Sequence, residues 1–451
     1  MSNKTLTYVE IDYDWCPLTF GESPCSAALG GDTTAKCWNT RATCQSPDDF
    51  QRTMKTLRFV KPTGYEPIDI SAIASVQSVS TSSAKIRPGE DLGERASVDV
   101  TFFDHPYHDR PVDKYWRERV SGEAQADGVG YRPQDVGTFW GKFRARFPYY
   151  RTRGLRIIQG TLGQSLDEME TRHYVMDSIA GPTANGTFRI TAKDVLKLAD
   201  DDKAQAPVAS RGTLARDIEE ADTEIRLTPT DVGSEYPSTG IVTIGNEICV
   251  YERDGDIMTL TRGQRGTNAE SHSEGDTAQL AIDYDSMLSG DIIRDLLVNY
   301  ADVPSRFIPI NDWQFQDREY ITRVFGALIT EPTSVSELIG QLCEQVGIIV
   351  WWDEVQQLIR YRAIRQPTDA PMVLNDNTDF LSGSIGVKEQ PKKRVSQVWV
   401  YYGVIDPTEK VDEARNYRSV YKRVETGAES ADQYDKPQIK KIYARWISRF
   451  N

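Results

Sequence analysis

The chain has 451 residues, a length that suggests about three domains. Its hydrophobic content of 39% and charged content of 27% are those of ordinary globular proteins, and the absence of a long apolar run excludes a membrane-spanning helix. The formal net charge of −14 argues against a protein that grips DNA or an acidic membrane through its overall field.

Four of the six cysteines lie near the N-terminus, at Cys16, Cys25, Cys37 and Cys44, with eight, eleven and six residues between successive ones. Structural zinc sites usually contain tight pairs of thiolates, and no such pair occurs here. Disulfides need an oxidising compartment, and residues 1–10 do not resemble a secretory signal. An iron–sulfur cluster accepts looser spacing. Zinc, and reduced cysteines without a metal, remain the alternatives.

The residues between these cysteines suit a cluster. Apolar side chains shelter such a group from water, and basic side chains offset its negative charge. We expect the first role for Trp15, Leu18, Phe20 and Trp38, and the second for Lys36 and Arg41.

The runs DWCPLTFG (residues 14–21) and KCWNTRATCQ (residues 36–45) resemble the opening of tail-tip or baseplate hub proteins of long-tailed, siphovirus-type bacteriophages and gene transfer agents. The cysteine spacing is also similar to that of the tail-tip proteins of lambda-like phages, whose cysteines hold an iron–sulfur cluster. The resemblance implies a [4Fe-4S] cluster on Cys16, Cys25, Cys37 and Cys44, with zinc as the alternative.

The same resemblance implies a non-enzymatic virion protein, assembled in the host cytoplasm. Such a hub closes the end of the tail tube and links it to the apparatus for host recognition and cell penetration. The implied partners are two further copies in a homotrimer, the distal tail protein, central fibre or tip proteins, and the tape measure. DNA passes through during ejection without specific binding.

Short strands are predicted after the cysteines, because period-two alternation and β-branched residues recur between turn signals. They fall at residues 57–60, 73–76, 95–103, 155–158, 171–176 and 187–191.

Residues 138–156 interleave basic and aromatic side chains, the composition of a single-strand nucleic-acid surface. The favoured interpretation is a helix-then-strand connection with a buried aromatic face. His105 and His108 among aspartates suggest a metal site, but a turn-rich loop is favoured.

A compact β domain follows, with strands at residues 224–227, 240–244, 247–252, 256–261 and 277–280, and a hairpin signal at Asp254 and Gly255. The glycine-rich residues 262–267 lack the lysine and the helix of a phosphate loop, so we predict a loop that ends a strand. Phage tail proteins contain a similar glycine-rich sequence.

Two helices and a hairpin come next. The apolar spacing predicts helices over residues 291–300 and 335–346, the second opened by a capping box of Ser334 and Glu337 and ended by Gly347. Strands at residues 348–352 and 357–361 form the hairpin. The last predicted strands cover residues 394–402, 417–422 and 439–447, with no closing element before Asn451, so the chain is expected to continue.

The predicted fold class is mainly β with α+β modules, a multi-domain arrangement of β-barrel or sheet domains with a loop segment that carries the four cysteines. Five domains are predicted: a four-cysteine segment at 1–50, a β-rich hub domain at 51–205, a small inserted β domain at 206–284, an α+β domain at 285–370 and a β domain at 371–451 that is open at its C-terminal end.

No nucleophile elbow, zincin motif, phosphate loop or dinucleotide fingerprint is present, so we predict no enzymatic activity. Two alternatives from other classes remain: an iron–sulfur redox or regulatory enzyme, and a tail-associated cell-wall glycosidase that uses paired carboxylates.

Overall fold

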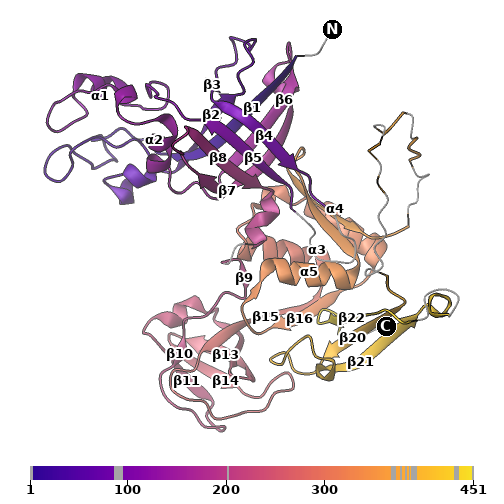
Figure 1. Ribbon diagram of the computed structural model, residues 1–451. Helices are drawn as coiled ribbons and strands as arrows, with labels where there is room; N and C mark the ends of the chain where they lie inside the picture. The colour runs from indigo at the N-terminus through magenta and orange to yellow at the C-terminus, as the bar shows by residue number, and fades with distance from the viewer. Residues whose placement is uncertain are drawn as a thin grey trace. The chain divides into compact units, whose positions relative to one another are not determined.

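The computed structural model describes residues 4–85, 95–200, 203–366, 372–375, 378–380, 383–384, 386, 394–430 and 436–448. The chain is mainly β, as predicted, with few helices (Figure 1). It divides into two compact units, of which the first has the described residues 4–85, 95–197 and 352–358. None of the helices in the described ranges has the length and apolar character needed to cross a membrane. The five domain boundaries stay a prediction.

The first unit contains one eight-stranded sheet, in the spatial order β3-β2-β1-β6-β7-β8-β5-β4 (Figure 1). Its strands are β1 (Thr5–Trp15), β2 (Thr53–Val60), β3 (Ile73–Ala74), β4 (Val76–Ser82), β5 (Ser97–Phe103), β6 (Gly154–Thr161), β7 (Glu170–Ala180) and β8 (Thr187–Lys193). Neighbours pair antiparallel except β2 and β3, which are parallel. All six strands predicted for this region are present.

Strand β1 was not predicted, although it lies inside the sheet between β2 and β6. Its acidic side chains at Glu10, Asp12 and Asp14 make the sequence look polar. Two of these carboxylates meet an arginine of a neighbouring strand: Glu10 lies 2.7 Å from Arg58 of β2, and Asp12 lies 2.7 Å from Arg156 of β6. Asp14 pairs with an arginine just before each of these strands. These ion pairs let a charged strand occupy the middle of a sheet.

Two helices accompany this sheet, α1 (Trp116–Ser121) and α2 (Phe139–Arg146). Helix α2 begins at Thr138, whose side chain accepts the Gly141 N–H, and it buries Phe139, Trp140 and Phe143 in the core of the sheet. The expected connection with a buried aromatic face is therefore confirmed.

The polar residues around α2 are engaged within the unit. Lys142 and Arg146 each lie 2.8 Å from the buried carboxylate of Asp109. His105 stacks on an aromatic ring of α2, and His108 Nδ1 accepts a hydrogen bond from the Arg110 N–H. The loop interpretation of the histidine pair agrees with these contacts.

The second unit contains a seven-stranded sheet in the order β10-β11-β14-β13-β12-β15-β16. Its strands are β10 (Thr213–Leu214), β11 (Glu224–Thr228), β12 (Thr239–Ile244), β13 (Glu247–Asp254), β14 (Ile257–Thr261), β15 (Ala278–Met287) and β16 (Phe325–Ile329). The predicted hairpin joins β13 and β14, but Asp254 pairs with Ile257, so the two turn residues are Gly255 and Asp256. Gly255 has φ +61°, which a first turn position of this kind requires.

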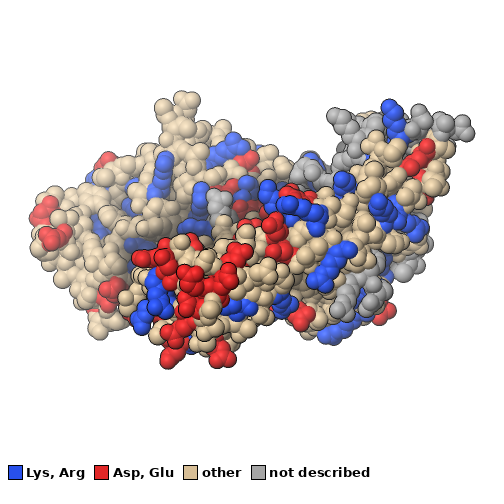
Figure 2. Space-filling view, turned by 90° about the horizontal axis from the view of Figure 1, so that it is seen from below, with Lys and Arg blue, Asp and Glu red and all other residues tan. Residues whose placement is uncertain are grey.

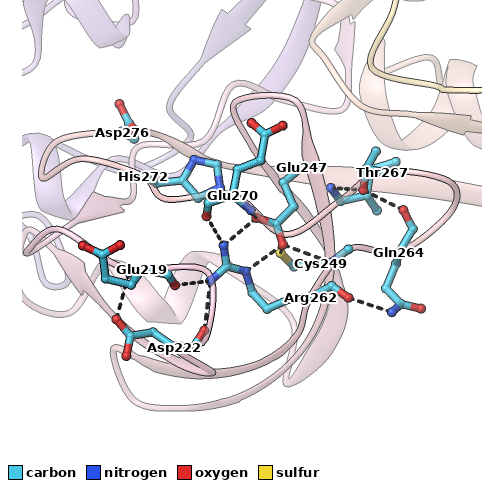
Figure 3. A network of polar contacts seen from close by, with 12 residues as sticks. Glu219, Asp222, Glu247, Cys249, Arg262, Gln264, Thr267, Glu270, His272 and Asp276 are labelled. Atoms are coloured by element: carbon cyan, nitrogen blue, oxygen red, sulfur yellow. Dashed lines mark hydrogen bonds and ion pairs between the residues drawn. The ribbon is translucent and has the colours of Figure 1, made fainter.

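The glycine-rich loop after β14 is fixed by a buried charge network (Figure 3). The carboxylate of Glu247, at the start of β13, accepts hydrogen bonds from Arg262 Nε and Nη2 at 2.6 Å and from the Gly263 N–H at 3.0 Å. It also lies 2.8 Å from His272 Nε2. Arg262 further donates to the backbone of Glu219, Asp222 and Glu270. This loop ends strand β14, as predicted, and His272 is part of the network that holds it.

The helices of the second unit are α3 (Ser289–Asp295), α4 (Ile310–Gln316) and α5 (Val335–Val346), and α3 and α4 each continue into a π-helical turn. The two predicted helices are confirmed, and Gly347 caps α5 with φ +79°. The predicted capping box is wrong. The Ser334 side chain makes no cap hydrogen bond and contacts Ser336 Oγ at 3.0 Å, while Glu337 accepts from Gln341 one turn later.

The remaining described strands form three smaller sheets. Strand β9 (Gln205–Ala206) pairs with β17 (Thr333–Ser334), and β18 (Ile348–Asp353) forms the predicted hairpin with β19 (Leu358–Ala363). In the last sheet, β20 (Gln397–Val404) lies between the antiparallel β21 (Tyr417–Val424) and the parallel β22 (Ile439–Ala444). The three C-terminal strands were predicted at these places.

Candidate metal centre

The four N-terminal cysteines line one small cavity in the first unit. Cys16 is buried, and Cys25, Cys37 and Cys44 are half-buried. The cavity has a volume of about 20 Å³, which is space for one water molecule. Loops separated by up to eleven residues in the sequence thus bring all four predicted ligands together.

Cys16 is held by the sheet, because it directly follows β1. Its N–H donates to the Asn39 carbonyl at 2.8 Å, and Asn39 Nδ2 donates back to the Cys16 carbonyl at 2.8 Å. Asn39 also donates to the Leu18 carbonyl at 3.0 Å and has φ +56°. This asparagine therefore fixes the first ligand to the segment that carries the third.

Asp49 joins the loop that carries Cys25 to the loop that carries Cys44. The Asp49 carboxylate accepts the Ser26 N–H at 2.8 Å and the Ser26 hydroxyl at 2.7 Å. These bonds keep the pKa of Asp49 below its usual value. Cys44 ends the short helical turn Arg41–Thr43, and Asp49 closes the next one, Pro47–Asp49. The loop of the second ligand is thus attached to that of the fourth.

Cys37 is held by a buried arginine from a distant part of the sequence. Arg119 of α1 donates to the Cys37 carbonyl at 2.8 Å and to the Lys36 carbonyl at 3.2 Å. Its guanidinium forms a buried ion pair with Asp113 at 2.6 Å and lies over the Trp38 ring at 4.1 Å. Removing one partner of such a buried pair typically costs about 3–5 kcal/mol.

Two of the four apolar side chains expected to shelter a cluster lie at the cavity. Leu18 and Phe20 line the cavity, and so does Phe50, which the sequence analysis did not include. Trp15 instead belongs to the main core of the sheet. Trp38 lines a different small cavity, beside α2.

The expected countercharges are occupied by other partners. Lys36 pairs with Glu118 at 2.7 Å, and Arg41 donates to the Pro47 carbonyl. Arg119 is the buried cation of this region. Nothing in a single sequence connects it with cysteines about eighty residues earlier, because only the folded chain brings α1 to them.

The chemistry of the four thiols fits a group that binds thiolates. Burial raises the pKa of Cys37 and of Cys44, and the other cysteines raise both pKa values further because neighbouring thiolates repel one another. A cationic metal core removes that repulsion. Among the described residues, no group of three or more His, Cys, Asp or Glu side chains is placed to hold a metal ion. The fit consequently rests on the identity of the four ligands and on their shared cavity.

Solved structures include chains that are similar to this one. No protein-family model matches the chain, and no curated protein matches it. A chain from the virion of a native gene transfer agent particle is similar over 61% of this chain and 78% of its own length, with 8% sequence identity and a TM-score of 0.20.

Proposed function

We propose that this protein is a structural component of a phage-type tail tip, a hub that carries an iron–sulfur cluster on Cys16, Cys25, Cys37 and Cys44. The observation that carries the cluster proposal is the shared cavity of these four cysteines. The hub role is supported by the amino-acid sequence of the segment that holds the four cysteines, which resembles the opening of hub proteins. An absence of catalytic activity is part of this proposal.

The four cysteines would add covalent links between segments that the hydrogen bonds of Asn39, Asp49 and Arg119 already hold together. Cys16 is fixed by β1, whereas Cys25, Cys37 and Cys44 lie on loops or at the end of a helical turn. When bound, the cluster supplies iron–thiolate bonds that cross-link these segments and add binding free energy to their folding.

Metal analysis of protein purified without oxygen tests the cluster. We expect brown protein with iron and acid-labile sulfide in near-equal amounts. Colourless protein with stoichiometric zinc would replace the cluster with a structural zinc site and leave the hub proposal standing. Metal-free protein that is fully folded would contradict any metal at this site.

Serine variants show which cysteines are ligands. We expect Cys16→Ser, Cys25→Ser, Cys37→Ser and Cys44→Ser each to lose most of the iron. The matched control is Cys343→Ser, a buried cysteine of α5 in the second unit. Its iron content should equal that of the wild type. Equal iron in Cys37→Ser and Cys343→Ser would remove Cys37 from the site.

Copy number tests the hub. The resemblance implies three copies at the end of a tail tube, with the distal tail protein, the tape measure and fibre or tip proteins as neighbours. We expect three copies per particle in purified tails, measured by quantitative mass spectrometry. One or six copies, or absence of the chain from the particles, would contradict the hub role without affecting the metal analysis.

A further inference from the structure

A groove of about 510 Å³ lies in the second unit, far larger than the cavity between the cysteines. One wall is strand β16 with its flanking residues, because every residue from Val324 to Glu331 lines the groove. The groove is also lined by the end of β20, by the loop after it, and by Arg418 and Arg445. The volume is in the range of ligand-binding clefts.

Strand β16 is the last strand of its sheet, so one of its edges faces this groove. The Gly326 N–H points to that edge, because it donates to the Trp446 carbonyl at 3.2 Å. In an antiparallel sheet, residues two apart direct their backbone groups to the same side. The N–H and carbonyl of Leu328 therefore point to the open edge, where no described residue forms a backbone hydrogen bond with them.

The groove also contains two arginines that have no hydrogen-bond or ion-pair partner among the described residues. Arg445 follows β22 and is half-buried, and its Nε has no hydrogen-bond partner in the described part of the chain. Arg418 lies on β21 and is exposed. A guanidinium in such a place gains most from a carboxylate, which accepts two of its N–H groups at once.

The other charged groups of the groove do not supply that carboxylate. Asp283 is paired with Arg265, and Glu409 lies 3.5 Å from Arg415. Asp285 accepts from Ser286. Glu331 is exposed and attracts Arg445 through its charge, but no ion pair or hydrogen bond joins these two described side chains. Within the described lining, the two arginines are therefore the groups best placed to bind an anion.

We propose that this groove binds an extended peptide segment of a partner protein. The segment adds a strand along the outer edge of β16, with its backbone hydrogen-bonded to Leu328, and places an aspartate or glutamate side chain on Arg445 and Arg418. The open strand edge favours a ligand with an extended peptide backbone, and the two arginines favour an acidic side chain in that ligand. This inference does not depend on the cluster or on the hub role.

Selection from a random nonapeptide library against the purified full chain tests this proposal. We expect the selected peptides to share β-forming residues and one acidic position. Replacing that acid with its amide should weaken binding about tenfold, because a charge-assisted hydrogen bond is worth roughly 1.5–3 kcal/mol. Methylating the peptide backbone nitrogens that face β16 should abolish binding, while the protein itself is unchanged.

Two protein variants complete the test. Arg445→Gln and Arg418→Gln should each remove the preference for the acidic peptide over its amide form, whereas Arg423→Gln, on the same strand as Arg418 but outside the groove, should keep it. Selected peptides without an acidic position, or a preference that survives in both variants, would overturn the proposal. Displacement of the peptide by inorganic phosphate alone, together with tolerance of backbone methylation, would identify a small-anion site and would also overturn it.

Discussion

A completely buried carboxylate stays ionised only when strong hydrogen bonds stabilise its charge. Glu247 is such a carboxylate, and its partners are drawn in Figure 3. Burial by itself raises the pKa of Glu247, but hydrogen bonds from Arg262, from His272 and from two backbone N–H groups lower it to about 2. The ordinary value is 4.5. Because the folded pKa is depressed, the stabilisation is fully present above about pH 4.5 and is lost as the pH falls through about 2.

We predict that Glu247→Gln destabilises the small β domain by about 3 kcal/mol at neutral pH, since it leaves the buried Arg262 without its counter-charge. The stability difference between wild type and variant should shrink as the pH falls from about 4.5 to about 2. Hydrogen exchange of β12 to β14 in the full chain measures both effects. Glu252→Gln, an exposed change on the same strand, is the control and should alter neither. A constant difference across this pH range would contradict the role given to Glu247.

The candidate metal centre shows which residues a sequence alone can identify. Cysteines are rare and their chemistry is distinctive, so four of them in a short segment could be assigned to one site, and the structure places them around one cavity. Asn39, Asp49 and Arg119 could not be identified in this way. Their side chains are common ones, and their role follows from hydrogen bonds formed only when the loops and α1 fold together.

At the scale of secondary structure, one carboxylate connects three elements of the second unit. Asp317, at the end of α4, is completely buried and accepts the Gly290 N–H of α3 at 2.8 Å and the Ser289 hydroxyl at 2.7 Å. It also accepts the hydroxyl of Tyr361 from β19. Burial and this carboxylate both raise the pKa of Tyr361, so the phenol remains a donor at any ordinary pH.

We predict that Asp317→Ala destabilises the full chain by about 3 kcal/mol or more, because three buried donors lose their acceptor together. Urea unfolding gives the size of the effect, and hydrogen exchange at the start of α3 gives its location. Asp312→Ala changes an exposed carboxylate of the same helix and should cost less than about 0.5 kcal/mol. Equal effects of the two substitutions would show that the Asp317 contacts contribute little.

Alternation of apolar and polar residues was a good guide to the strands but not to every one of them. Strand β1 was missed because its acidic residues obscure the alternation of apolar and polar side chains. Strand β16 was missed because it has only five residues, and Gly326 and Ala327 among them are weak strand formers. The capping box failed for a different reason. Its two residues have the right spacing, but Ser334 is already engaged with Ser336, so spacing alone did not decide the hydrogen bond.

At the scale of the whole molecule, the negative charge is unevenly distributed. Residues 210–278 contain fourteen acidic and six basic residues, a net charge of −8 out of the −14 of the whole chain. Figure 2 shows acidic side chains gathered in one broad patch on the face seen from below, with lysines and arginines spread over other parts of it. Such a surface repels the phosphate backbone of nucleic acids.

The basic stretch at residues 138–156 does not reverse this conclusion, because five of its six cations contact other groups of the protein. Arg144 donates to the Gly181 carbonyl, Arg153 lies 2.8 Å from Asp14, and Arg156 lies 2.7 Å from Asp12. Lys142 and Arg146 pair with Asp109, so four of these cations have a carboxylate partner within the protein.

We therefore predict that the full chain binds neither duplex nor single-stranded DNA at about 0.15 M salt, a condition under which non-specific binding depends on unpaired cations. Fluorescence anisotropy with labelled oligonucleotides measures this. Asp14→Asn should raise affinity at low salt, because it frees Arg153 from its ion pair. Arg151→Gln, which removes an exposed arginine of the same stretch, should change nothing. Tight binding by the wild type that weakens steeply with salt, and weakens further in Arg151→Gln, would show that residues 138–156 are a nucleic-acid surface after all.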